Sequence, residues 1–242
     1  MVPKDAAGDH AGVAVEQTIR ITAEALRDGS LIAAARLRMS DGAALRSDAE
    51  IEASLDAMLA SHPPGQDAWL FGYGSLMWNP AMHYAESRPG VVRGWHRSYC
   101  LWAHMGRGTP EAPGLMLALD HGGSSVGMLF RFPAATARAE LLLPWRREMF
   151  TGGYMARWVR VDSEGGPVRA ASFVANRAYP RYAGRLDETV IAASLAVAAG
   201  GLGTCAEYLA QTLGVLRAHG RTDHRLERLE RAVLRASAAS AR

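Results

Sequence analysis

A glycine-flanked loop is the first segment whose residue types could do chemistry. It runs from Phe71 to Pro80 and reads FGYGSLMWNP, with glycines on both sides of Tyr73. Glycine lets the backbone approach a ligand closely and turn successive N–H groups toward one point, where an anion such as a carboxylate would fit. A plain glycine-rich turn after a strand has the same spacing, so the residues alone leave both interpretations open.

The second segment is a glutamate among apolar residues. Glu148 lies in the run WRREMF, just before Thr151-Gly152-Gly153. Removal from water raises the pKa of a carboxyl group, which suits it to exchanging protons near neutral pH. A surface ion pair with Arg146 or Arg147 accounts for the same residues, and it is the simpler interpretation without further information.

Other familiar sites are missing from the sequence. We find no GxGxxG, GxxxxGK[ST] or GxSxG pattern, so no dinucleotide site, P-loop or nucleophile elbow is predicted. The eight histidines are scattered and no acidic cluster accompanies the pair His219 and His224. We therefore expect neither a metal nor a cofactor. Cys100 and Cys205 have no CxxC spacing, and we interpret them as ordinary half-buried thiols.

Composition and charge narrow the function classes further. The 242 residues carry a formal net charge of +3. Much of the late basic charge falls on Arg217, Arg221, Arg225, Arg228, Arg231 and Arg235. Because Leu226, Leu229 and Val233 interleave with these arginines, an amphipathic helix with a solvated face is favoured over nucleic-acid binding. No run is apolar and long enough for a membrane span or signal peptide, so we expect a cytoplasmic protein.

The N-terminal quarter is predicted to be helical. Residues 13–60 show no strand pattern and no proline, and Ser47 with Glu50 forms a capping box before a helix over 48–60. His62-Pro63-Pro64-Gly65 should stop that helix. We therefore divide the chain into a helical N-terminal extension, residues 1–65, and a catalytic domain with C-terminal helices, residues 66–242.

Strands and further helices follow. Strands are predicted over 68–71, over 115–119 and 126–132 as a hairpin turning at 120–125, and over 154–161 and 168–175 as a second hairpin turning at 164–167. Helices are predicted over 135–150, which carries Glu148, and over 186–199, 204–219 and 223–237, with a Thr204/Glu207 capping box. Hairpins and helices without regular βαβ alternation indicate the α+β class.

Several blocks in order carry a family resemblance. The phrases are FGYGSLMWNP, GWHRSYCLW, RGTPEAPGLMLAL, a Gly-Gly turn, WRREMFTGGY and GTCAEYL, spread over about Trp69 to Leu234. Together they resemble the ChaC-like γ-glutamylcyclotransferases, the glutathione-specific branch of that superfamily. The departures are small, since Met77 stands where Ile or Val is frequent and Cys205 where Asn is common.

The resemblance implies a fold and a site. The fold would be a mixed, partly closed β-barrel with flanking helices. Glu148 corresponds to the catalytic carboxylate. The residues implied in substrate binding are Phe71, Gly72, Tyr73, Gly74, Ser75, Leu76 and Tyr154. The implied substrate is glutathione, with no metal or cofactor and no nucleic-acid or membrane partner, and the sequence carries no signal for the oligomeric state.

The implied reaction is an internal aminolysis. The α-amine of the γ-glutamyl group attacks its own γ-carbonyl, closes 5-oxoproline and expels Cys-Gly, with Glu148 moving the proton. Loop N–H groups would bind either the substrate carboxylate or the oxyanion, and Ser75 would donate or accept a hydrogen bond; a Ser75 nucleophile competes with this. Alternative substrates are γ-glutamyl amino acids or γ-glutamylamines, and a non-catalytic γ-glutamyl-binding module is the alternative to an enzyme.

Overall fold

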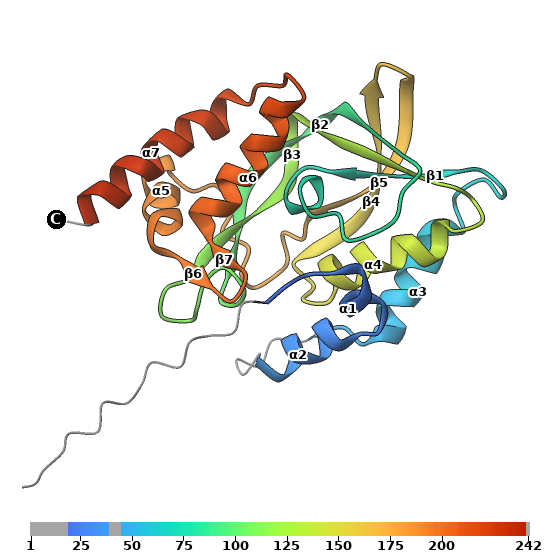
Figure 1. The fold of residues 1–242 in the computed structure, drawn as a ribbon, viewed down its shortest axis with the longest axis horizontal. Helices are drawn as coiled ribbons and strands as arrows, with labels where there is room; N and C mark the ends of the chain where they lie inside the picture. The colour runs from blue at the N-terminus through green and yellow to red at the C-terminus, as the bar shows by residue number, and fades with distance from the viewer. Residues whose placement is uncertain (1–18, 39–44, 241–242) are drawn as a thin grey trace, which may run out of the picture.

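The barrel at the centre of the molecule places this chain in the α+β class, as expected. The structure, a computed structural model, describes residues 19–38 and 45–240 (Figure 1). The barrel strands are β1 (Ala68–Gly72), β2 (Glu86–Ala103), β3 (Gly114–Phe132), β4 (Tyr154–Ser163) and β5 (Gly166–Ala175). They hydrogen-bond in the order β1-β3-β2-β4-β5 and close through β5.

The closed barrel contains both antiparallel and parallel strand pairs. Strand β1 runs antiparallel to β3 over its whole length, whereas it meets β5 in parallel at the pair Leu70 and Ala171. Strand β3 also meets β5 in parallel, at the pair Leu119 and Val174. Because the strands close on each other, the apolar side chains of their inner faces form one core.

The first predicted hairpin was wrong. Residues 115–119 and 126–132 belong to one continuous strand, β3, and its partner is β2, which was not predicted from the sequence. Gly122 and Gly123, with φ of 97° and 68°, lie opposite Gly94 alone. Two residues facing one form a β-bulge, so the glycines bend a strand instead of reversing it. The chain turns earlier, over residues 104–113, between β2 and β3.

The second hairpin and the helix before it agree with the prediction. Strands β4 and β5 pair antiparallel from Tyr154 with Ala175 to Ser163 with Gly166. Helix α4 (Ala137–Met149) precedes them and ends shortly before Gly152, whose φ is 76°. This helix brings Glu148 to one end of the barrel.

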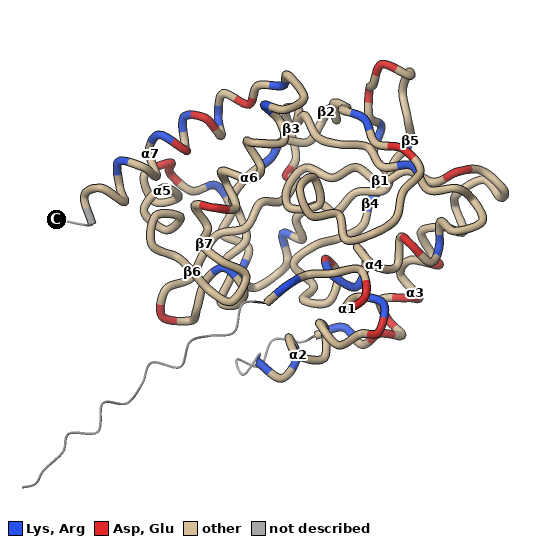
Figure 2. Tube along the Cα trace, viewed as in Figure 1, with Lys and Arg blue, Asp and Glu red and all other residues tan. Residues whose placement is uncertain are grey.

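The C-terminal helices also agree with the prediction. They are α5 (Glu188–Val197), α6 (Cys205–Ala218) and α7 (His224–Ser240), with the short strands β6 (Ala199–Gly200) and β7 (Gly203–Thr204) before α6. The capping box of Thr204 and Glu207 is present. On α7 the apolar side chains Leu226, Leu229 and Val233 are buried, and basic and acidic residues alternate along its length (Figure 2). Helix α7 is therefore amphipathic.

The N-terminal segment packs into the same core as the barrel. Its helices are α1 (Ala23–Arg27), α2 (Ser30–Arg38) and α3 (Asp48–Leu59), and the capping box of Ser47 and Glu50 opens α3. The remaining parts of the predicted helical stretch, 13–18 and 39–44, lie outside the described residues. Leu26, Ile51 and Leu55 are fully buried in one cluster with barrel residues. The boundary at residue 65 remains a prediction, and the apolar core extends across it.

Within the part of the chain that the structure describes, no helix is both long and apolar enough to cross a bilayer.

Candidate active site

A cavity of about 530 Å³ opens at the end of the barrel where α4 and α6 approach β2 and β3. Glu148, Ser75, Tyr154 and Tyr208 line it, and so do residues of the N-terminal segment from Ile19 to Arg38. Pockets for small ligands commonly measure about 300–1,000 Å³. The cavity is thus large enough for a substrate of a few residues.

Glu148 lies in the wall of this cavity, near the end of α4. Its side chain is only 14% exposed. Burial raises the pKa of the Glu148 carboxyl group, and the positive charge of Arg147 acts in the opposite direction. The Arg147 Nε atom lies 3.2 Å from Oε1 of Glu148. The ion pair and the raised pKa, which the sequence offered as alternatives, occur together.

Arg147 is itself held in place. Its side chain is 7% exposed, and its Nη1 donates a hydrogen bond of 2.6 Å to the backbone carbonyl of Asn79. Asn79 belongs to the glycine-flanked loop, so the loop and Glu148 are joined through one buried guanidinium. Because a buried ion pair needs fixed geometry, Arg147 restricts the positions that the Glu148 carboxylate takes.

Three tyrosines lie close enough to Glu148 for its charge to raise their pKa. Burial is the first cause for Tyr73, Tyr154 and Tyr208, and the Glu148 charge adds to it; the pKa of Tyr208 rises to about 12. The hydroxyl of Tyr154 donates to the carbonyl of Leu117 at 2.9 Å, and that of Tyr73 to the carbonyl of Phe173. All three phenols stay protonated at neutral pH and act as hydrogen-bonding groups.

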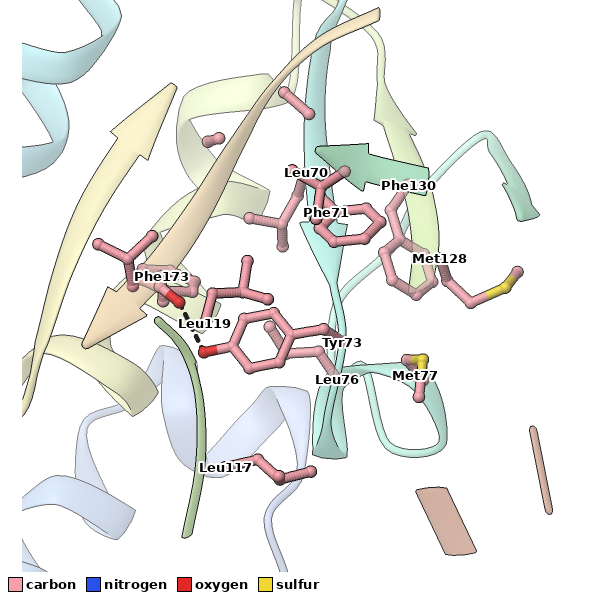
Figure 3. Close-up of a cluster of buried hydrophobic side chains, with 14 of the residues drawn as sticks. Leu70, Phe71, Tyr73, Leu76, Met77, Leu117, Leu119, Met128, Phe130 and Phe173 are labelled. Atoms are coloured by element: carbon pink, nitrogen blue, oxygen red, sulfur yellow. Dashed lines mark hydrogen bonds between the residues drawn. The ribbon is translucent and has the colours of Figure 1, made fainter. Parts of the chain in front are cut away.

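The predicted loop residues divide between the cavity and the core. Ser75 lines the cavity at the start of a short 3-10 helix, η1 (Ser75–Met77). Phe71 and Leu76 instead point into the apolar core together with Leu70 and Phe130, and the Tyr73 hydroxyl reaches Phe173 (Figure 3).

The structure therefore brings Ser75, Glu148 and Tyr154 together on one cavity. Among the predicted site residues, those that do not line the cavity are Phe71, Gly72, Tyr73, Gly74 and Leu76.

The two loop glycines are required by close packing. A Cβ atom at Gly72 would lie 3.0 Å from the Cβ of Leu76, and one at Gly74 would lie 2.5 Å from the hydroxyl oxygen of Tyr208. Gly74 thus lets α6 bring Tyr208 against the loop. Direct substrate contact by Phe71, Gly72 and their neighbours remains a prediction.

Sequence reasoning missed three groups at the cavity. Tyr208 comes from the block GTCAEYL and Asn79 from the loop phrase, but neither was singled out. Arg107 lies with its guanidinium carbon 5.3 Å from the ring centre of Tyr208, and its Nη1 donates to the carbonyl of Thr204 at 2.6 Å. Only their positions within the family blocks could have indicated these residues.

Neither cysteine lines the cavity. Cys100 and Cys205 are free and fully buried, where the sequence led us to expect half-buried thiols. In residues 19–38 and 45–240, no group of three or more His, Cys, Asp or Glu side chains has a metal-binding arrangement.

The fold and the cavity together define a class: an α+β barrel protein with one carboxyl group, that of the largely buried Glu148, in the lining of a cavity large enough for a small ligand. The model of the family described as ChaC-like protein matches residues 68–236, and this chain belongs to that family.

Curated relatives and a solved structure agree with this assignment. The chain is 47% identical over 158 residues to the glutathione-specific γ-glutamylcyclotransferase of Escherichia coli K12, covering 65% of this chain and 68% of that protein. It is 34% identical over 149 residues to the human glutathione-specific γ-glutamylcyclotransferase 1, covering 60% and 67%. The crystal structure of the yeast γ-glutamyl cyclotransferase specific to glutathione has the same fold, with a TM-score of 0.65 at 20% identity over 70% of this chain and 96% of that one.

Proposed function

We propose that this chain is a γ-glutamylcyclotransferase that cleaves glutathione to 5-oxoproline and Cys-Gly, with Glu148 as the acid/base. The observation that carries the proposal is the buried Glu148 in a cavity of a chain whose relatives, at up to 47% identity, bear that activity in their names.

The charge of the cavity lining supports an anionic substrate. Its charged residues other than histidine are five arginines and one glutamate, namely Arg20, Arg38, Arg107, Arg147, Arg181 and Glu148. Glutathione carries two carboxylates and one amine, so it complements this positive field. A γ-glutamylamine has one carboxylate fewer, and the lining therefore favours a γ-glutamyl peptide.

The raised pKa of Glu148 suits it to the first proton transfer. An α-amine has a pKa of about 8, so at neutral pH it is mostly protonated and must lose a proton before it attacks. A carboxylate whose pKa is raised by burial is a stronger base than one in water. Glu148 removes the proton, and the free amine attacks the γ-carbonyl of the same molecule.

The same group completes the reaction. Once protonated, Glu148 donates its proton to the departing peptide nitrogen, which would otherwise leave as a poor anion. The second proton of the attacking amine passes from the ring nitrogen to the released amine of Cys-Gly. Arg147 stabilises the carboxylate form between turnovers through the 3.2 Å contact. No water or covalent intermediate enters this sequence of steps.

The loop holds the folded conformer of the substrate. Attack within one molecule gains several kcal/mol when the reacting groups are well oriented. The first N–H groups of η1 have no partner within that helix, and its first residue, Ser75, lines the cavity. These donors, with the Ser75 hydroxyl, would bind the substrate α-carboxylate or the developing oxyanion. The Tyr154 hydroxyl already donates its proton to the carbonyl of Leu117, so it would accept a hydrogen bond from the substrate.

The test is formation of 5-oxoproline by the purified chain. It is incubated separately with glutathione, γ-glutamyl-alanine and a γ-glutamylamine. We expect product mainly from glutathione. Product mainly from either other compound would assign a different cyclotransferase activity. The absence of product from all three, with glutathione binding retained in calorimetry, would favour a non-catalytic binding module.

We keep a cytoplasmic location in this proposal, because both cysteines are free, as is usual in reducing compartments.

A further inference from the structure

The segment before α1, residues 19–22, lines the cavity and is hydrogen-bonded to two other parts of the chain. The backbone N–H of Ile19 donates to the carbonyl of Gly201, between β6 and β7, at 2.7 Å. The carbonyl of Ile21 accepts from Nδ2 of Asn79 at 3.1 Å. Figure 1 shows the dark blue chain passing from the β6–β7 side toward α4. Arg20 lies between the two attachments.

Helix α1, which continues this segment, is fixed as well. Nη1 of Arg146, on α4, donates to the carbonyls of Leu26 and Arg27 at 3.0 and 2.8 Å, and Leu26 is fully buried. The segment is therefore part of the cavity wall, although the family match begins only at residue 68.

The exposed fractions of four charged side chains indicate how deep each lies in the cavity. Glu148 and Arg147 are 14% and 7% exposed, so they form the floor. Arg20 and Arg38 line the same cavity but are exposed, so they lie at its rim. A substrate whose reacting end meets Glu148 and whose other end extends toward the rim would therefore approach these arginines.

We propose that Arg20, assisted by Arg38, binds the C-terminal carboxylate of the substrate and so makes the N-terminal segment a specificity element. This inference rests on the proposed function. In glutathione the glycine carboxylate lies two residues beyond the scissile amide nitrogen, an extended reach of about 7 Å. Arginine suits this task because its planar fork of donors matches a carboxylate.

The experiment compares two substrates that contain the same three residues. One is glutathione, and the other is its glycine monoethyl ester, which lacks the charge that Arg20 would bind. In the wild type we expect a higher KM for the ester. In Arg20→Gln the KM for glutathione should rise roughly 1.5- to fivefold, as for loss of an exposed ion pair, and it should rise further in the Arg20→Gln/Arg38→Gln double variant. The KM for the ester and both kcat values should change little.

The matched control is Arg27→Gln. Arg27 lies in the same segment but outside the cavity lining, where it pairs with Glu140. The Arg27→Gln variant should leave the ratio of the KM for the ester to the KM for glutathione at the wild-type level.

The ways in which the proposal could fail are distinguishable. A wild type that forms no 5-oxoproline from glutathione overturns the proposed function and this inference with it. A wild type that is active, with an unchanged KM ratio in the double variant, overturns the role of the arginines alone. An equal rise in KM for both substrates indicates a general disturbance of the wall and also contradicts the proposal.

Discussion

Glu148 is subject to two opposing influences that the sequence shows only as neighbours. Burial raises its pKa and Arg147 lowers it, with burial the larger effect. The residues alone left the role of this carboxyl group and of Ser75 open, and the family resemblance predicted that they would carry chemistry. The sequence could not predict that Arg147 would be fixed by the carbonyl of Asn79, because a long-range backbone contact leaves no signal in spacing.

The raised pKa of Glu148 makes a prediction about stability. The folded chain holds the Glu148 proton more tightly than the unfolded chain, whose carboxyl group titrates near the ordinary value of 4.5. The stabilisation is therefore complete below that pH and is lost as the pH rises through the folded pKa. Glu148→Gln has no such group. We expect its melting temperature, relative to the wild type, to increase across this window in thermal denaturation at a series of pH values; a constant difference would contradict the raised pKa.

Gly74 and Tyr208 make a second prediction at the residue scale. An alanine Cβ at position 74 would meet the Tyr208 hydroxyl at 2.5 Å. Gly74→Ala should therefore lower the free energy of unfolding by about 1–3 kcal/mol, as overpacking does. Tyr208→Phe removes the oxygen, so the double variant should recover part of that loss. Urea denaturation measures the free energy of unfolding of each variant. Additive losses of this free energy in the double variant would show that the two side chains are not in contact.

At the scale of elements, the sequence predicted the helices and strands that residues close together in the chain determine. Strands β4 and β5, helix α4 and both capping boxes follow from turn and cap residues close in sequence. Strand β2 was missed because Pro89, Gly90 and Gly94 interrupt its pattern, and its pairing with β3 supplies the order that its own residues lack. The glycines at 122 and 123 suggested a turn, since the same residue type serves turns and bulges.

Two capping boxes allow a matched test at this scale. Thr204→Ala and Ser47→Ala each remove one cap, and each should lower the free energy of unfolding by about 1 kcal/mol. Only Thr204 caps α6, the helix that carries Tyr208, so only Thr204→Ala should also raise the KM for glutathione. Chemical denaturation and steady-state kinetics measure the two effects. Equal kinetics in both variants would mean that the start of α6 does not position the site.

At the scale of the whole molecule, the N-terminal segment is joined to the barrel through a shared core and a shared cavity. The sequence predicted its helices but not where they pack, because residues 19–38 and the cavity residues of α6 are far apart along the chain. Leu26 and the barrel side chains belong to one apolar cluster. We therefore expect the segment and the barrel to unfold together.

Two leucines test this continuity. Leu26 is fully buried and Leu37, on the neighbouring helix, is 88% exposed. Leu26→Ala should lower the free energy of unfolding by about 2–5 kcal/mol in a single transition, as for other buried leucines, whereas Leu37→Ala should change it little. Calorimetry measures both. A separate early transition in Leu26→Ala, with the main one unchanged, would show that the segment folds independently.

The central claim is that Glu148 moves the proton, and the most direct measurement is 5-oxoproline formation from glutathione by Glu148→Gln. Glu140→Gln is the control, since Glu140 lies on the same helix with the same 14% side-chain exposure but outside the cavity lining. Loss of an acid/base group should lower kcat by about 10²–10⁴-fold. Calorimetry should show glutathione binding within a few fold of the wild type. A Glu148→Gln variant that binds glutathione and turns it over at the rate of the Glu140→Gln control would contradict the account.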